Sequence, residues 1–193
     1  LHNGHLSLIQ ASQESCDCTI VSIFVNPTQF GPNEDFDKYP RKKEADLSVC
    51  QKAMVDIVFM PKIQEIYPFS CEFQITFNAP MAMANILEGK TRPGHFNGVL
   101  QVVHKLFNLT QANKAFFGKK DAQQLLIIQQ MVEDLFLPIE IIPCPIVRTQ
   151  EGLALSSRNA YLTKEGKKEA LKISQSLNTA TKMIMQGEIE SAK

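Results

Sequence analysis

Residues 19–27 read Thr-Ile-Val-Ser-Ile-Phe-Val-Asn-Pro, and this stretch decides the fold class that we expect. A β-branched apolar run that ends at Asn-Pro is typical of a strand buried on both faces of a parallel sheet. Residues 55–60, Val-Asp-Ile-Val-Phe-Met, repeat the pattern and end at Pro61. Further strands are predicted at residues 73–77, 114–117 and 139–142.

Helical patterns lie between these strands, at residues 6–15, 41–54, 81–87, 96–110 and 121–135, and a charged helix is predicted to begin at Thr163 and to end near Gly187. Strands that alternate with helices predict an α/β fold with a Rossmann-like doubly wound parallel sheet, which binds ligands beyond the carboxyl ends of its strands. The first helix should itself follow a strand, so we expect that strand to precede Leu1. The pattern changes after Pro145, which divides the chain into a Rossmann-like domain (1–145) and the beginning of a small C-terminal α+β lid domain (146–193).

The composition is that of an ordinary globular protein. The 193 residues are 44% hydrophobic and 21% charged, and the formal net charge is zero. This balance gives no electrostatic reason to expect nucleic acid or an anionic membrane as a partner. Five cysteines without a metal-site spacing favour reduced thiols, and therefore a cytoplasmic location.

The first five residues, Leu1-His2-Asn3-Gly4-His5, form a His-x-Gly-His motif at the start of a helical pattern. A helix N-terminus presents N–H donors and a positive dipole end, and Gly4 has no Cβ to obstruct a phosphate. The two imidazoles add further donors. We interpret the motif as a cradle for a nucleotide polyphosphate, with two surface histidines at a frayed end as the alternative.

Four other segments carry polar side chains in loops. Gln29 follows the first visible strand and suits a ligand with hydroxyl and carboxylate groups, or else it bonds a local turn. Residues 118–121 (Gly-Lys-Lys-Asp) place a cation and a capping carboxylate before a helix, with Gln124 one turn later. Residues 155–158 (Leu-Ser-Ser-Arg) offer hydroxyls and a phosphate-binding guanidinium, or an ordinary capped turn. Residues 92–95 (Arg-Pro-Gly-His) either supply an anion site or form a rigid turn.

Together and in order, these segments resemble the pantothenate synthetase family of the HxGH nucleotidyltransferase superfamily. The blocks that carry the resemblance are His-x-Gly-His, SIFVNPxQF, YPR, EIYP, LEGxxRPGHFxGV, FGxKDxQQ and LSSRN with a following YLT. They extend from residue 1 to about residue 163. Several separated blocks in register are far more specific than any one of them.

The resemblance implies ATP-dependent ligation of (R)-pantoate and β-alanine to pantothenate through a pantoyl adenylate, with release of AMP and pyrophosphate. It assigns His5 as the catalytic proton donor, Gln29 and Gln124 to pantoate, and Gln29 also to β-alanine. No residue is assigned as a direct metal ligand. The ATP-binding residues that it implies are Leu1, His2, Asn3, Gly4, His5, Gly118, Lys119, Lys120, Asp121, Val147, Leu155, Ser156, Ser157 and Arg158.

The resemblance also implies Mg²⁺ with ATP, a homodimer, and no nucleic-acid or membrane partner. Family members have a strand ending in Pro-Thr-Met-Gly before the His-x-Gly-His motif and a larger C-terminal domain, so we expect the chain to be truncated at both ends. Two other functions remain as alternatives. One is another HxGH adenylyltransferase acting on phosphopantetheine or nicotinamide mononucleotide, and the other is a non-catalytic nucleotide-binding paralogue.

Overall fold

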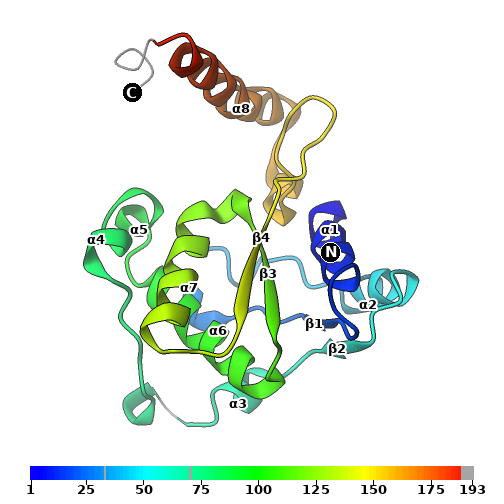
Figure 1. The fold of residues 1–193 in the computed structure, drawn as a ribbon, viewed down its shortest axis with the longest axis vertical. Coiled ribbons are helices and arrows are strands. Elements are labelled where there is room, and N and C mark those ends of the chain that lie inside the picture. Colours follow the sequence, from blue (N-terminus) through cyan, green and yellow to red (C-terminus); the bar gives the residue numbers. More distant parts are fainter. Residues whose placement is uncertain (33, 70, 188–193) are drawn as a thin grey trace. The chain divides into compact units, whose positions relative to one another are not determined.

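A computed structural model describes residues 1–32, 34–69 and 71–187 of the chain (Figure 1). The described chain forms two compact units. The first unit combines Leu1–Leu6 with Ile146–Lys193, and the second comprises Ser7–Pro145. The predicted assignment of residues 1–145 and 146–193 to functional domains stays a prediction.

The second unit contains parallel strands, as the apolar runs predicted. Strand β1 (Ile20–Ser22) pairs in parallel with β2 (Ile57–Phe59), and β3 (Lys114–Gly118) pairs in parallel with β4 (Glu140–Cys144). The mixed α/β class is therefore confirmed. A single continuous sheet is not present among the described residues, because each of these strands has one partner and the two pairs form separate two-stranded sheets.

Helices complete the second unit, and the core lies along two of them. The longest is α6 (His95–Thr110), whose predicted apolar face is the centre of the hydrophobic core: Phe96, Val99, Val102 and Val103 are buried. It packs against α7 (Ala122–Asp134), which contributes Ile127, Ile128 and Met131 (Figure 1). The other helical elements are α1 (Asn3–Gln13), which crosses the boundary between the units, α2 (Lys43–Lys52), α3 (Ile63–Ile66), α4 (Met81–Ala84), α5 (Leu87–Thr91), and the short 3₁₀ turns η1 (Pro27–Gln29), η2 (Cys71–Phe73) and η3 (Lys119–Asp121).

Two local predictions are wrong. The alternating residues 73–77 form no strand, and α6 holds this segment through Gln101, whose Nε2 donates to Gln74 Oε1 at 3.2 Å and to the carbonyl of Ile75 at 3.3 Å. Residues 81–87 are not one helix, because the chain turns between α4 and α5. A Cβ on Gly89 would lie 1.8 Å from the carbonyl oxygen of Ala84, so the two short helices meet through main-chain contact.

The first unit joins the amino-terminal turn to a hairpin-like segment and a long helix. Arg148 and Ala154 form an antiparallel bridge, and the 3₁₀ turn η4 (Ser157–Tyr161) follows. Helix α8 (Lys164–Met185) begins at Thr163, as predicted, because the Thr163 side chain accepts a hydrogen bond from the Gly166 N–H at 3.0 Å.

No helix in the described part of the chain is long and apolar enough to cross a membrane. Cys16, Cys18, Cys50 and Cys144 are free thiols. The side chain of Cys71 lies outside what the structure describes.

Candidate active site

The His-x-Gly-His motif forms the first turn of α1. The carbonyl of His2 accepts hydrogen bonds from the N–H groups of His5 at 2.7 Å and Leu6 at 3.1 Å, so His2 occupies the cap position. The two imidazole rings lie against each other, with centroids 3.9 Å apart. The motif is therefore a compact, helix-initiating turn rather than a frayed end.

The ring nitrogens of these two histidines have defined roles. His2 Nδ1 accepts from the Gly4 N–H at 3.1 Å, and His5 Nδ1 accepts from the His2 N–H at 3.2 Å. An imidazole nitrogen that accepts carries no proton, so in both neutral rings the proton is on Nε2. Each neutral ring therefore carries its proton on Nε2.

Gly4 leaves room for the His2 ring. A Cβ there would lie 2.9 Å from Cε1 and 3.0 Å from Nδ1 of His2. The His2 ring therefore lies where a side chain at position 4 would begin, and the predicted approach of a phosphate to Gly4 stays a prediction. Glycine at this position therefore permits the His2–Gly4 hydrogen bond.

The Leu-Ser-Ser-Arg segment lies in the same unit as this turn. A Cβ on Gly4 would be 3.7 Å from Cβ of Leu155, which places the two predicted ATP-binding segments beside each other. The Leu155 N–H donates to the carbonyl of Val147 at 2.9 Å, so Val147, another predicted ATP-binding residue, is held beside the segment. Ser156 caps η4 by accepting from the Arg158 N–H at 3.3 Å.

In the second unit, Gln29 ends the 3₁₀ turn η1, and Asn26 organises that turn. Buried Asn26 accepts from the hydroxyls of Thr28 (3.0 Å) and Tyr67 (2.8 Å), and its Nδ2 donates to the carbonyl of Gly98 at 3.1 Å. Sequence reasoning noted Asn-Pro only as the end of a strand. The signal it missed is that an Asn followed by Pro-Thr can cap a turn with its side chain.

Gly98 on α6 allows the Gln29 turn to approach the helix closely. A Cβ on Gly98 would lie 2.1 Å from the carbonyl oxygen of Thr28 and 2.9 Å from the backbone nitrogen of Gln29. No side chain fits in that gap. Direct contact between the main chain of the Gln29 turn and the main chain of α6 therefore fixes the position of Gln29.

Arg92, from the Arg-Pro-Gly-His segment, is engaged entirely by the protein. Its Nε and Nη2 donate to the two carboxylate oxygens of Glu34 at 2.9 and 2.6 Å, a bidentate ion pair. Nη1 donates to Glu88 Oε1 at 2.8 Å and lies 3.0 Å from Nε2 of His95, and Nη2 also donates to the carbonyl of Gln29 at 3.2 Å. A guanidinium has five N–H donors, and these five contacts use all of them. The geometry favours the rigid-turn interpretation of this segment over the anion site.

His95 in the same cluster is neutral. Its Nδ1 lies 2.9 Å from the carbonyl of Gln29, which can only accept, so Nδ1 carries the proton and Nε2 accepts from Arg92. Burial lowers the pKa of His95, and the nearby Arg92 charge lowers it further. The 4.0 Å approach of Nε2 to Glu88 is consequently not an ion pair. The Arg92 hydrogen bonds lower the pKa of Glu34, and those of Glu34 raise the pKa of Arg92.

The predicted ATP loop at residues 118–121 is formed by the end of β3 and by η3. Lys120 Nζ pairs with Asp121 Oδ1 at 2.7 Å. The expected capping of α7 by the Asp121 side chain is wrong: Asp121 is the N-cap residue but its carboxylate makes no capping bond, because the adjacent ammonium engages it.

Two neighbouring glutamines on α7 differ in role. The Gln123 side chain accepts a hydrogen bond from the Glu88 N–H at 3.1 Å and donates to the carbonyls of Met83 and Ile86 at 2.6 and 2.9 Å. These bonds hold the turn between α4 and α5. Gln124, the predicted pantoate ligand, is half-buried one residue later.

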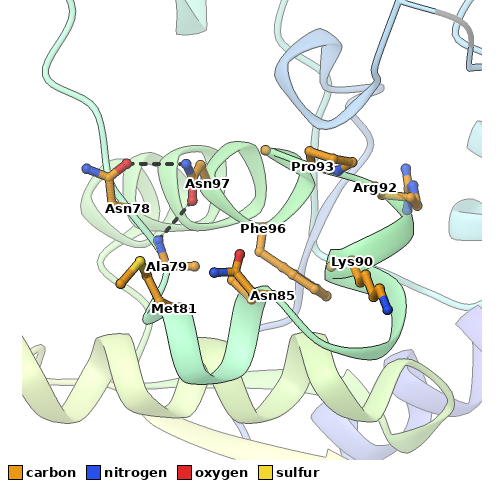
Figure 2. Close-up of a pocket in the computed structure, with 12 residues that line it drawn as sticks. Asn78, Ala79, Met81, Asn85, Lys90, Arg92, Pro93, Phe96 and Asn97 are labelled. Carbon is orange, nitrogen blue, oxygen red and sulfur yellow. Dashed lines mark hydrogen bonds between the residues drawn. The ribbon is translucent and has the colours of Figure 1, made fainter.

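A cavity of about 590 Å³ lies beside the Arg-Pro-Gly-His turn in the second unit (Figure 2). Three amide side chains border it, and Asn97 there accepts from the Ala79 N–H at 2.9 Å and donates to Asn78 at 3.3 Å. Its lining residues are Asn78, Ala79, Met81, Ala84, Asn85, Gly89, Lys90, Arg92, Pro93, Gly94, Phe96 and Asn97. This cavity therefore contains Arg92 but none of the residues predicted to bind ATP or pantoate.

Comparisons with known proteins agree with this assembly of motifs. The pantoate–β-alanine ligase family model matches residues 1–193. Pantothenate synthetase of Wolinella succinogenes is 60% identical over the whole chain, which covers 70% of that protein, and the Aliarcobacter butzleri protein is 59% identical over 97% of this chain and 68% of its own length.

Solved structures show the same fold. The crystal structure of pantothenate synthetase from Thermus thermophilus matches all of this chain and 69% of its own with a TM-score of 0.96, at 42% identity. A pantoate–β-alanine ligase structure from Francisella tularensis, complexed with β-γ ATP and β-alanine, matches 91% of this chain and 66% of its own with a TM-score of 0.85, at 45% identity.

The architecture and the family match define an ATP-dependent acid–amino-acid ligase. The chain belongs to the pantoate–β-alanine ligase family, whose enzymes join pantoate to β-alanine with ATP. The family and the activity expected from the sequence are thereby confirmed.

Proposed function

We propose that the His-x-Gly-His turn binds the ATP polyphosphate and that the acid site is formed around Gln29 and Gln124. Pantoate's carboxylate attacks the α-phosphorus of ATP, the bond from that phosphorus to the bridging oxygen breaks, and pyrophosphate leaves. The amine of β-alanine then attacks the carbonyl carbon of pantoyl adenylate and expels AMP. The single observation that supports the polyphosphate assignment is the placement of both imidazole rings together in the turn that begins α1.

Charge neutralisation is the main task of such a site. A carboxylate and a polyphosphate repel each other, so donors aimed at the phosphate oxygens lower the barrier to attack. The proposed donors are the two imidazoles, the backbone N–H groups of the first turn of α1, and the side chains of Lys120 and Arg158. His5 donates a hydrogen bond from Nε2 to the departing pyrophosphate. Delivery of that proton requires the imidazolium form, in which Nδ1 is also protonated and no longer accepts from the His2 N–H. The protein supplies no covalent nucleophile. The remaining proposed ATP contacts are those predicted above.

The acid site needs groups that both donate and accept, because pantoate carries two hydroxyls as well as its carboxylate. The amides of Gln29 and Gln124 meet that requirement without adding charge. Gln29 also serves β-alanine, which the Francisella tularensis relative holds together with an ATP analogue.

Mg²⁺ belongs to the proposal as the ion carried by ATP. The described residues contain no cluster of three or more His, Cys, Asp or Glu side chains able to hold a metal. Mg²⁺ suits phosphate and water ligands, so the donor set fits delivery as MgATP and gives no reason for a separate protein cage. The ion would neutralise phosphate charge, and no step here is assigned to it.

A homodimer and a cytoplasmic location complete the proposal. The family resemblance supports the dimer, and the free thiols together with the biosynthetic activity support a reducing compartment. Sedimentation equilibrium of the whole protein tests the first, and fractionation of the source cells tests the second.

The adenylation step is tested by exchange of labelled pyrophosphate into ATP. Exchange that requires pantoate and proceeds without β-alanine supports the proposed intermediate. Exchange driven only by phosphopantetheine or nicotinamide mononucleotide, or ATP binding with no exchange, would contradict it. Omitting β-alanine is the essential control, because a concerted ligation would give no exchange under that condition.

A further inference from the structure

We propose that Arg92 and His95 are positioning residues for the acid site, and that Glu34 latches the loop after Gln29 onto them. The inference rests on the proposed role of Gln29. It concerns a cluster to which the proposed chemistry gives no function.

Two donors converge on the main-chain carbonyl of Gln29. His95 Nδ1 approaches it at 2.9 Å and Arg92 Nη2 at 3.2 Å. A carbonyl oxygen has two lone pairs, so it accepts both bonds at once. Together with the Gly98 contact behind the turn, they fix the residue that presents the Gln29 amide.

The loop that leaves Gln29 returns to the same guanidinium. Glu34 lies five residues beyond Gln29, and both of its carboxylate oxygens accept hydrogen bonds from Arg92. The pair is largely shielded, with side chains 19% and 24% exposed. Charge-assisted forked bonds in such a place hold their geometry far better than an exposed ion pair does. Arg92 thereby ties both ends of the segment 29–34 to the start of α6.

Glu88 supplies an internal comparison. It bonds the same guanidinium at 2.8 Å but sits on α5, one helical turn before Arg92, and makes no link to the loop. If Arg92 only needed neutralisation, loss of either carboxylate would have the same effect. If Glu34 is a latch, its loss alone releases the loop.

This arrangement requires His95 to be neutral. A protonated ring would turn an N–H toward Arg92 and remove the acceptor for Nη1. Burial disfavours the charged form and lowers the pKa of His95, so the neutral ring keeps Nδ1–H directed at the carbonyl of Gln29, 2.9 Å away. The ring therefore acts on substrate through Gln29 and not by contact.

The experiment compares Glu34→Gln with Glu88→Gln in the whole protein. Both changes remove one carboxylate charge from Arg92 and keep the side-chain size. Trypsin cleavage after Lys38 and Arg41 reports release of the loop, and the KM values for pantoate and ATP in pyrophosphate exchange report the site. We expect Glu34→Gln to speed cleavage and to raise the pantoate KM by about tenfold, with the ATP KM and kcat within about twofold.

Two further variants separate positioning from general damage. Glu34→Asp keeps the charge, and we expect its pantoate KM to lie between those of the unsubstituted protein and of Glu34→Gln. Arg92→Lys cannot form the fork and the carbonyl bond together, so it should resemble Glu34→Gln. Thermal melting of each variant shows whether the fold is retained.

Equal effects of Glu34→Gln and Glu88→Gln on cleavage and on the pantoate KM would overturn the proposal. Faster cleavage with an unchanged pantoate KM would overturn it as well, because the loop would then move without affecting the site. Absence of exchange in the unsubstituted protein would count against the proposed function instead. The cleavage rates would still decide whether Glu34 holds the loop.

Discussion

Two helices of this chain begin at histidine-containing turns, and the turns use their imidazoles in opposite ways. At the start of α1, the Nδ1 atoms of His2 and His5 accept backbone hydrogen bonds, so each neutral ring presents Nε2–H. At the start of α6, His95 donates from Nδ1 to the carbonyl of Gln29 and accepts from Arg92 at Nε2. The difference teaches that the partner of Nδ1 decides which ring nitrogen carries the proton of a neutral histidine: an N–H partner leaves it on Nε2, and a carbonyl partner holds it on Nδ1.

The largest effect should come from the α1 turn. Replacing His5 with alanine removes the proposed proton donor to pyrophosphate, and general acid catalysis of this kind contributes about 10²- to 10⁴-fold. We expect the pyrophosphate-exchange kcat to fall within that range with little change in melting temperature. His104→Gln is the control, because His104 lies in the body of α6 and belongs to neither turn; it should retain activity within about threefold. A His5→Ala protein as active as the His104→Gln protein would contradict the proposed role of His5.

The second-largest effect should come from displacing the Gln29 carbonyl, which accepts the hydrogen bond from His95. In Gly98→Ala, the new methyl group would meet the Thr28 carbonyl at 2.1 Å, which forces the Gln29 turn away from α6. Overpacking against backbone should reduce the free energy of unfolding by about 1–3 kcal/mol and raise the pantoate KM.

Gly166→Ala is the matched control, because its Cβ would have 3.4 Å to its nearest neighbour at the start of α8. An alanine there should stabilise the helix by up to about 1 kcal/mol. The urea-unfolding free energies of both variants check the pair. A Gly98→Ala protein as stable as Gly166→Ala would show that the turn does not rest on the helix backbone.

A smaller effect should appear in the pH dependence of the free energy of unfolding. Burial lowers the pKa of His95 in the folded protein, with Arg92, Glu88 and Glu34 facing the ring. The unfolded chain therefore binds more protons than the folded one as the pH falls through 6.5, and stability is lost in that direction. Glu34, whose pKa Arg92 lowers, adds a second loss as the pH falls below 4.5.

Urea unfolding at a series of pH values checks the window near neutrality. His95→Gln should flatten the decline that begins near pH 6.5. His104, whose pKa burial also lowers, contributes in the same direction, so His104→Gln is the reference variant. An unchanged pH dependence in His95→Gln would mean that the ring is not held neutral by its site.

The smallest effect sharpens the contrast between buried and exposed charge. Glu169 and Lys172 on α8 pair at 2.6 Å, but their side chains are 68% and 69% exposed. Glu169→Gln should change the free energy of unfolding by less than about 0.5 kcal/mol. A cost as large as that of Glu34→Gln in thermal or urea unfolding would show that ion-pair geometry matters more here than shielding.

Local patterns predicted much of this fold, whereas long-range pairings did not follow from them. The periodic apolar face of α6 and the Thr163 cap depend on residues within a few positions, and both are found. The strand at residues 73–77 failed because alternation fits an extended segment that lacks a neighbouring strand. Whether parallel strands merge into one sheet depends on non-local pairing that periodicity does not encode.

The candidate site shows the same division. The His-x-Gly-His turn, the residue 155–158 segment and the Gln29 position were all apparent from the sequence. The role of Arg92 was not, because its principal partner Glu34 lies 58 positions away. The capping prediction for Asp121 failed for a nearer reason: Lys120, one residue before, competes for the same carboxylate.

The contact between Gly98 and the Thr28 carbonyl has a consequence for changing the enzyme's acid preference. Both surfaces that meet there are main chain, so no substitution at that point enlarges the space; every side chain other than hydrogen reduces it. If Gln29 lines the acid site as proposed, a variant that accepts a bulkier hydroxy acid must gain its room away from this contact, because the contact itself offers none.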